Sequence, residues 1–274
     1  MAINIIPVKS LEDPRLAPYR NLRERTLRGE SVFIAEGRLV TERLLDSSFE
    51  TESLLTSTDA AEVFSPDFAV KIGSRPVYTL PRKENLSQIA GFPFHQGVLA
   101  LGRRKSLPDF PEAMTAWGSA PGTWIVLPNA TKPDNLGLVF RSAAALGASG
   151  VVLGERCCDP FSRRALRVSM GGVLQVPVIQ ARNLRREILR LRETGHLCFY
   201  ATLLDADATP LSNIRTRPAQ IAVLFGNEYS GLDPEDATLC NRKVTIPMAP
   251  GVDSLNLGVS VGIFLYVLSR VPIS

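Results

Sequence analysis

The second half of the chain alternates short, continuously apolar runs with longer segments of helical periodicity. The apolar runs are typical of strands and read “TWIVLP”, “GVVLG”, “VLQVPV”, “HLCFYATL”, “AQIAVLFG” and “KVTIPM”. Helical segments such as “NLGLVFRSAAALG” stand between them, and in this one Leu136, Val139 and Phe140 share one face. Because apolar strands separated by helices form parallel sheets that are covered on both faces, we expect residues 122–274 to fold as an α/β domain.

Residues 1–106 show the same alternation on a smaller scale. The strand-like runs “SVFIA”, “SLLTS”, “PVYTL” and “QGVLALG” alternate with the helical runs “EGRLVTERLLDSS”, “DAAEVF” and “RKENLSQIAG”. This pattern predicts a small α/β sandwich. Residues 107–121 contain three prolines and no sustained periodicity, so we expect a linker there, with room for a short helical turn.

The composition is that of a globular protein with a mild positive charge. The 274 residues are 45% hydrophobic with a formal net charge of +4, which favours a polyanionic partner without naming one. Taken singly, each basic run is better explained as a solvated face than as an RNA contact, and the run on a helix with intervening acids is assigned to solvent. The three runs are Arg20, Arg23, Arg25 and Arg28; Arg163, Arg164 and Arg167; and Arg182, Arg185, Arg186, Arg190 and Arg192.

No sequence feature predicts export or membrane insertion, and we expect a cytoplasmic protein. The N-terminus “MAINIIPVKSLEDPR” lacks a basic segment followed by a long apolar one. The apolar stretch Leu255–Val271 includes Asn256 and is shorter than the roughly 20 residues of a membrane span, so it predicts a buried core helix. The cysteines lack the C-x-x-C spacing of a metal or redox site, which favours reduced, unpaired thiols. They are Cys157, Cys158, Cys198 and Cys240.

Three loops that follow apolar strands carry the polar residues of a candidate site. They read “NATKPDN”, “GNEYSG” and “APGVDSLN”, and in parallel sheets such loops gather at one edge, where ligands bind. The alternative is that they only cap helices, with Asp253 or Ser254 as the cap of the last one. G-x-G-x-x-G and G-x-x-x-x-G-K-[ST] motifs are absent, which argues against a dinucleotide or P-loop site. Neither His95 nor His196 is placed to be catalytic.

Taken together, three stretches resemble the SpoU/TrmH class of SPOUT methyltransferases. They are “NATKPDNLGLVFRSAAALGASGVVL”, “AVLFGNEYSGLD” and “VTIPMAPGVDSLNLGVSVGIFLY”. The resemblance implies an enzyme that methylates the ribose 2′-hydroxyl of structured RNA (rRNA or tRNA) with S-adenosyl-L-methionine and needs no metal. It also implies a deep trefoil knot in the C-terminal segment and a homodimer, since the family builds its site at a subunit interface. In the first domain “FIAEGRLVTERLL” and “HQGVLAL” resemble the L30e-like substrate-binding domain.

The resemblance also implies which residues form the site. Loop residues would hold the cofactor mainly through backbone groups; the set is Thr202, Leu203, Leu224, Gly226, Asn227, Ile246, Met248, Ser254 and Leu255. The implied catalytic set is Asn135, Arg141, Glu228, Ser254 and Asn256. A guanidinium is a poor proton acceptor, so we expect Arg141 to hold the phosphate and polarise the hydroxyl. Glu228 is the remaining titratable candidate for removing the proton or orienting the arginine.

Three positions depart from the family pattern. Lys132 stands where many relatives have an acid, which can alter substrate contacts, and Gly258 and Ser260 alter the start of the last helix. Two rival hypotheses remain open. One is an RNA-binding protein that kept the fold but lost catalysis, and the other is a dehydrogenase-like nucleotide enzyme, which the missing glycine motif argues against.

Overall fold

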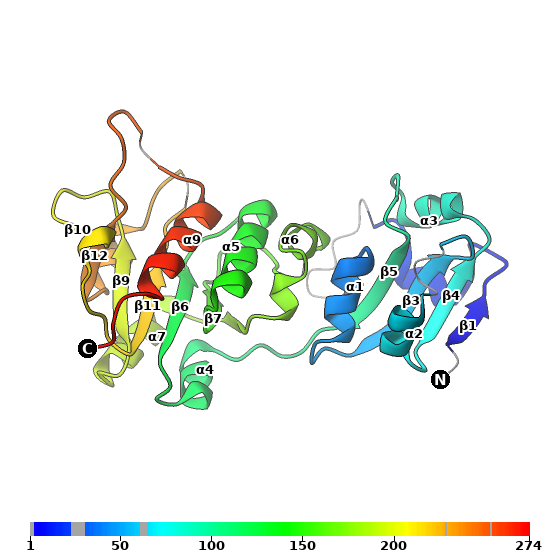
Figure 1. The fold of residues 1–274 in the computed structure, drawn as a ribbon, viewed down its shortest axis with the longest axis horizontal. Helices are drawn as coiled ribbons and strands as arrows, with labels where there is room; N and C mark the ends of the chain where they lie inside the picture. Colours follow the sequence, from blue (N-terminus) through cyan, green and yellow to red (C-terminus); the bar gives the residue numbers. More distant parts are fainter. Residues whose placement is uncertain (1–2, 23–30, 61–64, 228, 253) are drawn as a thin grey trace. The chain divides into compact units, whose positions relative to one another are not determined.

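The computed structural model describes the chain in two compact units. Unit 1 consists of Met1–Lys105 and Asp159–Gln175, and unit 2 consists of Ser106–Cys158 and Val176–Ser274. Each unit has its own sheet with helices packed on it (Figure 1). The described residues are 3–22, 31–60, 65–227, 229–252 and 254–274.

The strands of unit 1 form one mixed sheet in the order β1-β4-β3-β5-β2. β1 and β3 run parallel to β4, whereas β5 runs antiparallel to both β2 and β3. The elements are β1 (Asn4–Pro7), η1 (Pro14–Tyr19), β2 (Val32–Glu36), α1 (Arg38–Leu45), β3 (Thr51–Ser57), α2 (Pro66–Ile72), β4 (Pro76–Leu80), α3 (Lys83–Ala90), β5 (Val98–Arg103), α6 (Arg163–Val168) and η3 (Gly172–Leu174). The α/β sandwich expected from the sequence therefore takes in a later segment of the chain.

That later segment packs on β2 through charged side chains. Glu36 is only 4% exposed, and its carboxylate lies 3.1 Å from Arg163 Nη2 and 3.6 Å from Arg167 Nη1. Arg163 also donates to the carbonyl of Leu22 at 2.6 Å. These two arginines are therefore not on a solvated face, because the buried carboxylate requires a cationic partner. In the first basic run, Arg20 pairs with Glu12; Arg23, Arg25 and Arg28 lie outside the described residues.

The strands of unit 2 form a parallel sheet in the order β10-β12-β9-β11-β6-β7-β8, which confirms the expected parallel α/β fold. α5 and α9 lie side by side on one face of this sheet (Figure 1). The elements are α4 (Phe110–Trp117), β6 (Gly122–Leu127), α5 (Pro133–Leu146), β7 (Gly150–Leu153), β8 (Val178–Gln180), α7 (Leu184–Glu193), β9 (Cys198–Thr202), β10 (Thr209–Pro210), η4 (Leu211–Asn213), β11 (Gln220–Leu224), α8 (Pro234–Thr238), β12 (Arg242–Thr245) and α9 (Leu257–Leu268).

The opposite face of the unit 2 sheet is covered by α4 and α7. Trp124 and Val126 of β6 share a buried cluster with Phe110 of α4 and Ile188 of α7. Because side chains alternate along a strand, the intervening residues of β6 face α5 and α9 instead. Both faces are thus buried, which explains why the strands of this unit are continuously apolar.

Several local expectations were wrong. The run “VLQVPV” is not one strand, because Gly172–Leu174 forms a 3-10 turn and β8 begins only at Val178. An apolar run of this length can be buried in either conformation, so periodicity could not separate the two. β1 and α2 were not expected at all, and of the helix expected in “DAAEVF”, residues 61–64 lie outside the described residues.

Two further segments make contacts that the sequence did not reveal. Arg185 of α7 contacts three carboxylates near α8, those of Asp233, Glu235 and Asp236, so this arginine joins two helices instead of facing only solvent. Within residues 107–121, α4 runs for two turns from an N-cap at Asp109. Its Phe110 is fully buried, so this segment belongs to the core of unit 2.

Glu187 of α7 fixes α4 in this place. One carboxylate oxygen, Oε2, accepts a hydrogen bond from the backbone N–H of Phe110 at 3.1 Å. The other, Oε1, accepts from the N–H groups of Arg182 at 2.7 Å and Asn183 at 3.1 Å. A single buried acid thereby accepts from the first backbone N–H of α4 and from two N–H groups at the entry to α7.

We expect Glu187→Ala to destabilise unit 2 and to loosen α4. Losing a charged acceptor of three backbone bonds costs on the order of 3 kcal/mol in the free energy of unfolding, and chemical denaturation measures it. Limited proteolysis should also cut between α4 and β6 more readily. Glu193→Ala, an exposed change on the same helix, is the matched control. Equal stability of the two variants would contradict the assigned role of Glu187.

Candidate functional site

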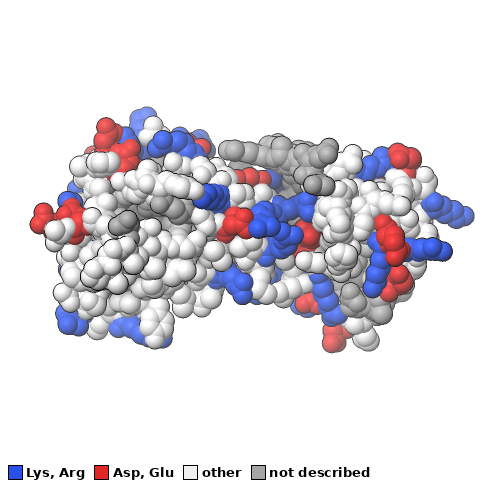
Figure 2. All heavy atoms as spheres, turned by 90° about the horizontal axis from the view of Figure 1, so that it is seen from above, with Lys and Arg blue, Asp and Glu red and all other residues white. Residues whose placement is uncertain are grey.

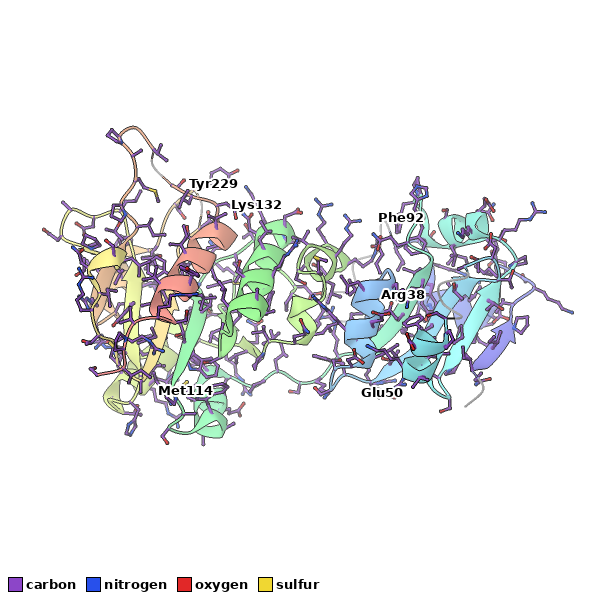
Figure 3. The ribbon with its side chains drawn as sticks, viewed as in Figure 1. Arg38, Glu50, Phe92, Met114, Lys132 and Tyr229 are labelled. Atoms are coloured by element: carbon purple, nitrogen blue, oxygen red, sulfur yellow. The ribbon has the colours of Figure 1, made fainter. Side chains whose placement is uncertain are left out.

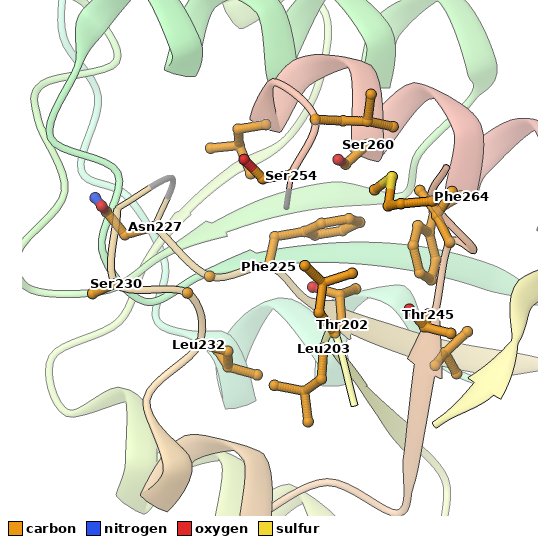
Figure 4. Close-up of a pocket in the computed structure, with 18 of the residues that line it drawn as sticks. Thr202, Leu203, Phe225, Asn227, Ser230, Leu232, Thr245, Ser254, Ser260 and Phe264 are labelled. Carbon is orange, nitrogen blue, oxygen red and sulfur yellow. The ribbon is translucent and has the colours of Figure 1, made fainter. Parts of the chain in front are cut away.

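A pocket of about 480 Å³ opens at the carboxyl ends of β9, β11 and β12 (Figure 4). Its walls come from the segments that follow these three neighbouring strands and from the start of α9. The lining residues are Thr202, Leu203, Leu204, Phe225, Gly226, Asn227, Tyr229, Ser230, Gly231, Leu232, Val244, Thr245, Ile246, Met248, Ser254, Leu255, Leu257, Ser260 and Phe264. Parallel strands end at the same edge of a sheet, which is why segments distant in sequence meet here.

Aromatic and aliphatic side chains form much of the pocket surface. The rings of Phe225 and Phe264 pack edge to face with centroids 5.2 Å apart, and both residues are buried. Thr202 donates its hydroxyl to the carbonyl of Leu224 at 2.9 Å, which ties the end of β9 to the end of β11. The pocket therefore has an apolar floor whose shape is set by the sheet.

The loop after β11 closes tightly over one side of the pocket. Asn227 and Gly231 exchange two backbone hydrogen bonds of 2.9 and 2.8 Å. Gly231 adopts a φ of +67°, a conformation that glycine takes without strain. A Cβ on Gly226 would lie 2.1 Å from backbone atoms of Gly231 and Leu232. The close approach of the two strands of this loop therefore requires glycine at position 226.

Asn135 and Asn256 meet next to the pocket, although they lie 121 residues apart in sequence. Asn256 Nδ2 donates to Asn135 Oδ1 at 2.9 Å, and Asn135 is 9% exposed. Asn256 Oδ1 also accepts from the N–H of Gly258 at 2.9 Å, so Asn256 is the N-cap of α9. Ser254, which the helix-cap alternative named, is therefore not the cap, and Asp253 lies outside the described residues.

Close packing of α9 on α5 brings these two side chains together. A Cβ on Gly258 would lie 2.4 Å from Cβ of Leu138, and Ser142 Oγ donates to the carbonyl of Gly258 at 3.1 Å. Gly258, a departure from the family pattern, is therefore required here because it lets the two helix backbones approach.

The other implied catalytic residues are less constrained by contacts. Arg141 is exposed on α5, two turns after the start of the helix, and Ser254 is an exposed residue at the pocket wall. Glu228 lies outside the described residues. Within the described part of the chain, the structure thus joins Asn135 to Asn256 and places Ser254 at the pocket.

The structure places most of the cofactor residues implied by the sequence around the pocket. Thr202, Leu203 and Gly226 line it, as do Asn227, Ile246, Met248, Ser254 and Leu255, whereas Leu224 is fully buried in β11 and contributes its carbonyl to Thr202. Sequence reasoning missed the aromatic floor and the outer loop residue Tyr229. Only its position inside “GNEYSG” could have pointed to Tyr229.

The pocket is electrically neutral over its described lining. Its walls contain amide, hydroxyl, aliphatic and aromatic groups, and no lysine, arginine, aspartate or glutamate is among them. The visible face of unit 2 is likewise largely uncharged, with charged side chains mainly at its margins (Figure 2). Such a site suits an amphipathic small molecule held by backbone groups.

Other candidate chemistries lie away from this pocket. His196 is exposed near the opposite, amino-terminal end of β9, and His95 belongs to unit 1. The described residues include no group of three His, Cys, Asp or Glu side chains placed to hold a metal ion. All four cysteines are free; burial raises the pKa of Cys157, whose thiol donates to the carbonyl of Leu127. In the described chain, no helix combines the length and apolarity of a membrane span.

Comparison with known sequences places residues 122–266 in the SpoU rRNA Methylase family. An uncharacterized tRNA/rRNA methyltransferase of Mycobacterium bovis is 34% identical over 265 residues, which cover 94% of this chain and 90% of the relative. A 23S rRNA (guanosine-2′-O-)-methyltransferase of Acinetobacter baylyi is 31% identical over 191 residues, covering 69% of this chain and 76% of the relative.

Comparison with solved structures leads to the same family. An rRNA methyltransferase from Sinorhizobium meliloti, solved with bound AdoMet, superposes with a TM-score of 0.80 at 28% identity. The match covers 97% of this chain and 98% of that one, so it includes both units and their sheets. The family match over residues 122–266, the relative that aligns along almost the whole chain and this structural match all agree. The protein belongs to the SpoU rRNA methylase family.

Proposed function

We propose that the pocket at the carboxyl ends of β9, β11 and β12 is the methyl-transfer site of this enzyme. The protein is an RNA methyltransferase that uses S-adenosylmethionine and modifies a ribose 2′-hydroxyl. The observation that carries the proposal is the hydrogen bond between Asn135 and Asn256 beside a neutral pocket built from three strand-end loops. It joins the first and last sequence motifs at one point.

The residues of the pocket fit the cofactor. A volume of about 480 Å³ lies within the roughly 300–1,000 Å³ of small-molecule sites. Gly226, Ile246 and Leu255 would hold it through backbone groups, with Phe225 and Phe264 supplying apolar surface. The described lining residues include no lysine or arginine that would repel a sulfonium cation. When bound, S-adenosylmethionine supplies an electrophilic methyl group on that sulfonium.

We expect the protein to bind S-adenosylmethionine or S-adenosylhomocysteine and not NAD. Gly226→Ala should lower the affinity for both at least tenfold, because its Cβ would push the loop of Gly231 away from the pocket. Isothermal titration calorimetry measures the affinity for S-adenosylmethionine, S-adenosylhomocysteine and NAD. Gly262→Ala, whose Cβ would make only ordinary contact with Ser142, should bind as the wild type does. NAD binding, or full affinity of Gly226→Ala, would overturn this assignment of the pocket.

We assign substrate positioning to Arg141, Ser254 and Asn256. Arg141 holds the RNA phosphate and polarises the 2′-hydroxyl, since a guanidinium donates hydrogen bonds and does not accept protons. Asn256, oriented by Asn135, and Ser254 hold the substrate or the arginine by hydrogen bonds. Glu228 is the candidate for removing the hydroxyl proton. Alignment of the ribose oxygen at about 3 Å from the methyl carbon supplies much of the acceleration.

Arg141→Ala should lower kcat on the order of a hundredfold without unfolding the protein, because an exposed group that contacts only substrate is lost. Asn256→Asp should have a similar effect, since it keeps an oxygen for capping Gly258 but loses the donor to Asn135. Tritium transfer into unmethylated RNA measures both.

Asn256→Ala is a less clean test, because loss of an N-cap costs about 1 kcal/mol of stability by itself. Arg186→Ala, an exposed change on α7, serves as the control and should retain full activity. Near-normal turnover in either test variant would remove that residue from the proposed site.

We propose a homodimer that uses the outer face of α9. Val259 is 48% and Tyr266 is 52% exposed, and they lie seven residues apart on one side of the helix with the half-buried Ile263 between them. An apolar stripe of this kind on a helix favours contact with a second protein surface.

We expect sedimentation equilibrium to give twice the chain mass of 29.9 kDa for the wild type. Tyr266→Glu places a charge within the proposed interface and should give a single-chain mass at the same concentration. Arg215→Glu, a charge change outside α9, is the control. A monomeric wild type would contradict the dimer.

We propose further that unit 1 is an L30e-like domain that captures rRNA or tRNA. Its mixed sheet with helices on it and the match of whole chains support this. Photo-crosslinks from bound RNA should map to unit 1 as well as to unit 2, and mapping 2′-O-methyl sites in RNA from cells with and without the gene would identify the nucleotide.

We also propose that the C-terminal segment forms a trefoil knot. β12 lies beyond β9 and β11 in the sheet, yet α9 returns to pack on α5 beside β6. An experimental chain trace through residues 199–274 tests the knot, and an unthreaded trace would exclude it.

A further inference from the structure

Tyr229 presents an aromatic ring at the rim of the pocket. Its side chain is 82% exposed although it belongs to the pocket lining. Most of the ring is therefore accessible to solvent at the rim of the pocket. A large aromatic ring exposed beside a binding site is unusual, because burying it would be favourable.

The backbone that carries this ring is held in place. The N–H of Tyr229 donates to Asn227 Oδ1 at 3.0 Å, within the turn closed by the paired Asn227 and Gly231. Asn227 Nδ2 in turn donates to the carbonyl of Asn129 at 3.4 Å, which links the turn to the loop after β6. The ring is thus displayed from a turn with several hydrogen bonds.

A cationic side chain lies against this ring. Lys132 Nζ is 2.9 Å from Tyr229 Oη and 4.3 Å from the ring centroid (Figure 3). Lys132 is the residue before α5 and stands three positions before Asn135. The two loops therefore bring one aromatic ring and one ammonium group to the same rim, next to the proposed methyl-transfer site.

We propose that Tyr229 and Lys132 form a substrate-positioning platform, on which a nucleobase adjoining the modified ribose stacks while Lys132 contacts a neighbouring phosphate. This inference rests on the proposed methyl-transfer site. Every nucleobase has a flat face that can stack on an aromatic ring, and an adjacent cation strengthens the hold on the backbone. RNA recognition by splayed bases uses this combination. Stacking here would fix the ribose for the alignment that methyl transfer needs.

The test compares two probes on the full-length protein. One is a 12-nucleotide oligoribonucleotide and the other is the same ribose-phosphate chain without bases. We expect the wild type to prefer the probe with bases, and Tyr229→Ala to lose roughly 5- to 150-fold of its affinity for that probe alone, as expected for one lost stack. Tyr229→Phe keeps the ring and should keep the preference. Fluorescence anisotropy measures each dissociation constant.

Lys132→Gln should behave differently from Tyr229→Ala. It should lower the affinity for both probes by the same factor. It should also reduce the dependence of binding on salt by about one phosphate contact. A wild type that shows no preference for bases, or a Tyr229→Ala variant that retains the preference, would overturn the platform.

Calorimetry with S-adenosylhomocysteine separates this inference from the proposed pocket. Tyr229→Ala should bind it as the wild type does. Loss of cofactor binding with unchanged RNA binding would make Tyr229 a wall of the cofactor pocket and overturn the platform. If the wild type itself fails to bind the cofactor, the proposed pocket fails, while the base preference remains measurable on its own.

Discussion

The close packing of α9 against α5 is the constraint on which the site depends. It requires a glycine at position 258, because any side chain there would collide with Leu138. With the two helices in contact, Asn256 at the start of α9 reaches Asn135 in the first turn of α5. A polar contact between residues so far apart in sequence depends on the burial of the apolar surface between the two helices.

Two helix starts therefore shape the chemistry of the pocket. Asn256 caps α9 through its Oδ1 atom and donates to Asn135 through its Nδ2 atom. One side chain therefore both stabilises the helix and fixes the position of Asn135. Glu187 likewise accepts hydrogen bonds at the starts of two helices, α4 and α7, on the other face of the sheet. Each of these two side chains thus bonds several partners at once.

Charge is used differently in the two units. In unit 1 the buried Glu36 is paired with Arg163 and Arg167 from a segment far along the chain. These two positive charges therefore stabilise the fold. In unit 2 the described pocket lining is neutral. At its rim, the cationic Lys132 lies against the aromatic ring of Tyr229. Net charge alone could not have revealed this division of roles.

The sequence by itself determined the parallel α/β fold of unit 2 and its strand-end loops, because apolar periodicity and loop motifs are local properties of the chain. The family resemblance implied a part of the pocket lining. Tertiary structure decided the rest. It determined that α4 belongs to the core, that residues 159–175 pack on the first sheet, and that Asn256 caps α9. Each of these depends on a partner distant in sequence, such as Glu187 for α4 or Glu36 for Arg163. A pattern read along the chain contains no information on which distant group will satisfy a buried charge or a free N–H.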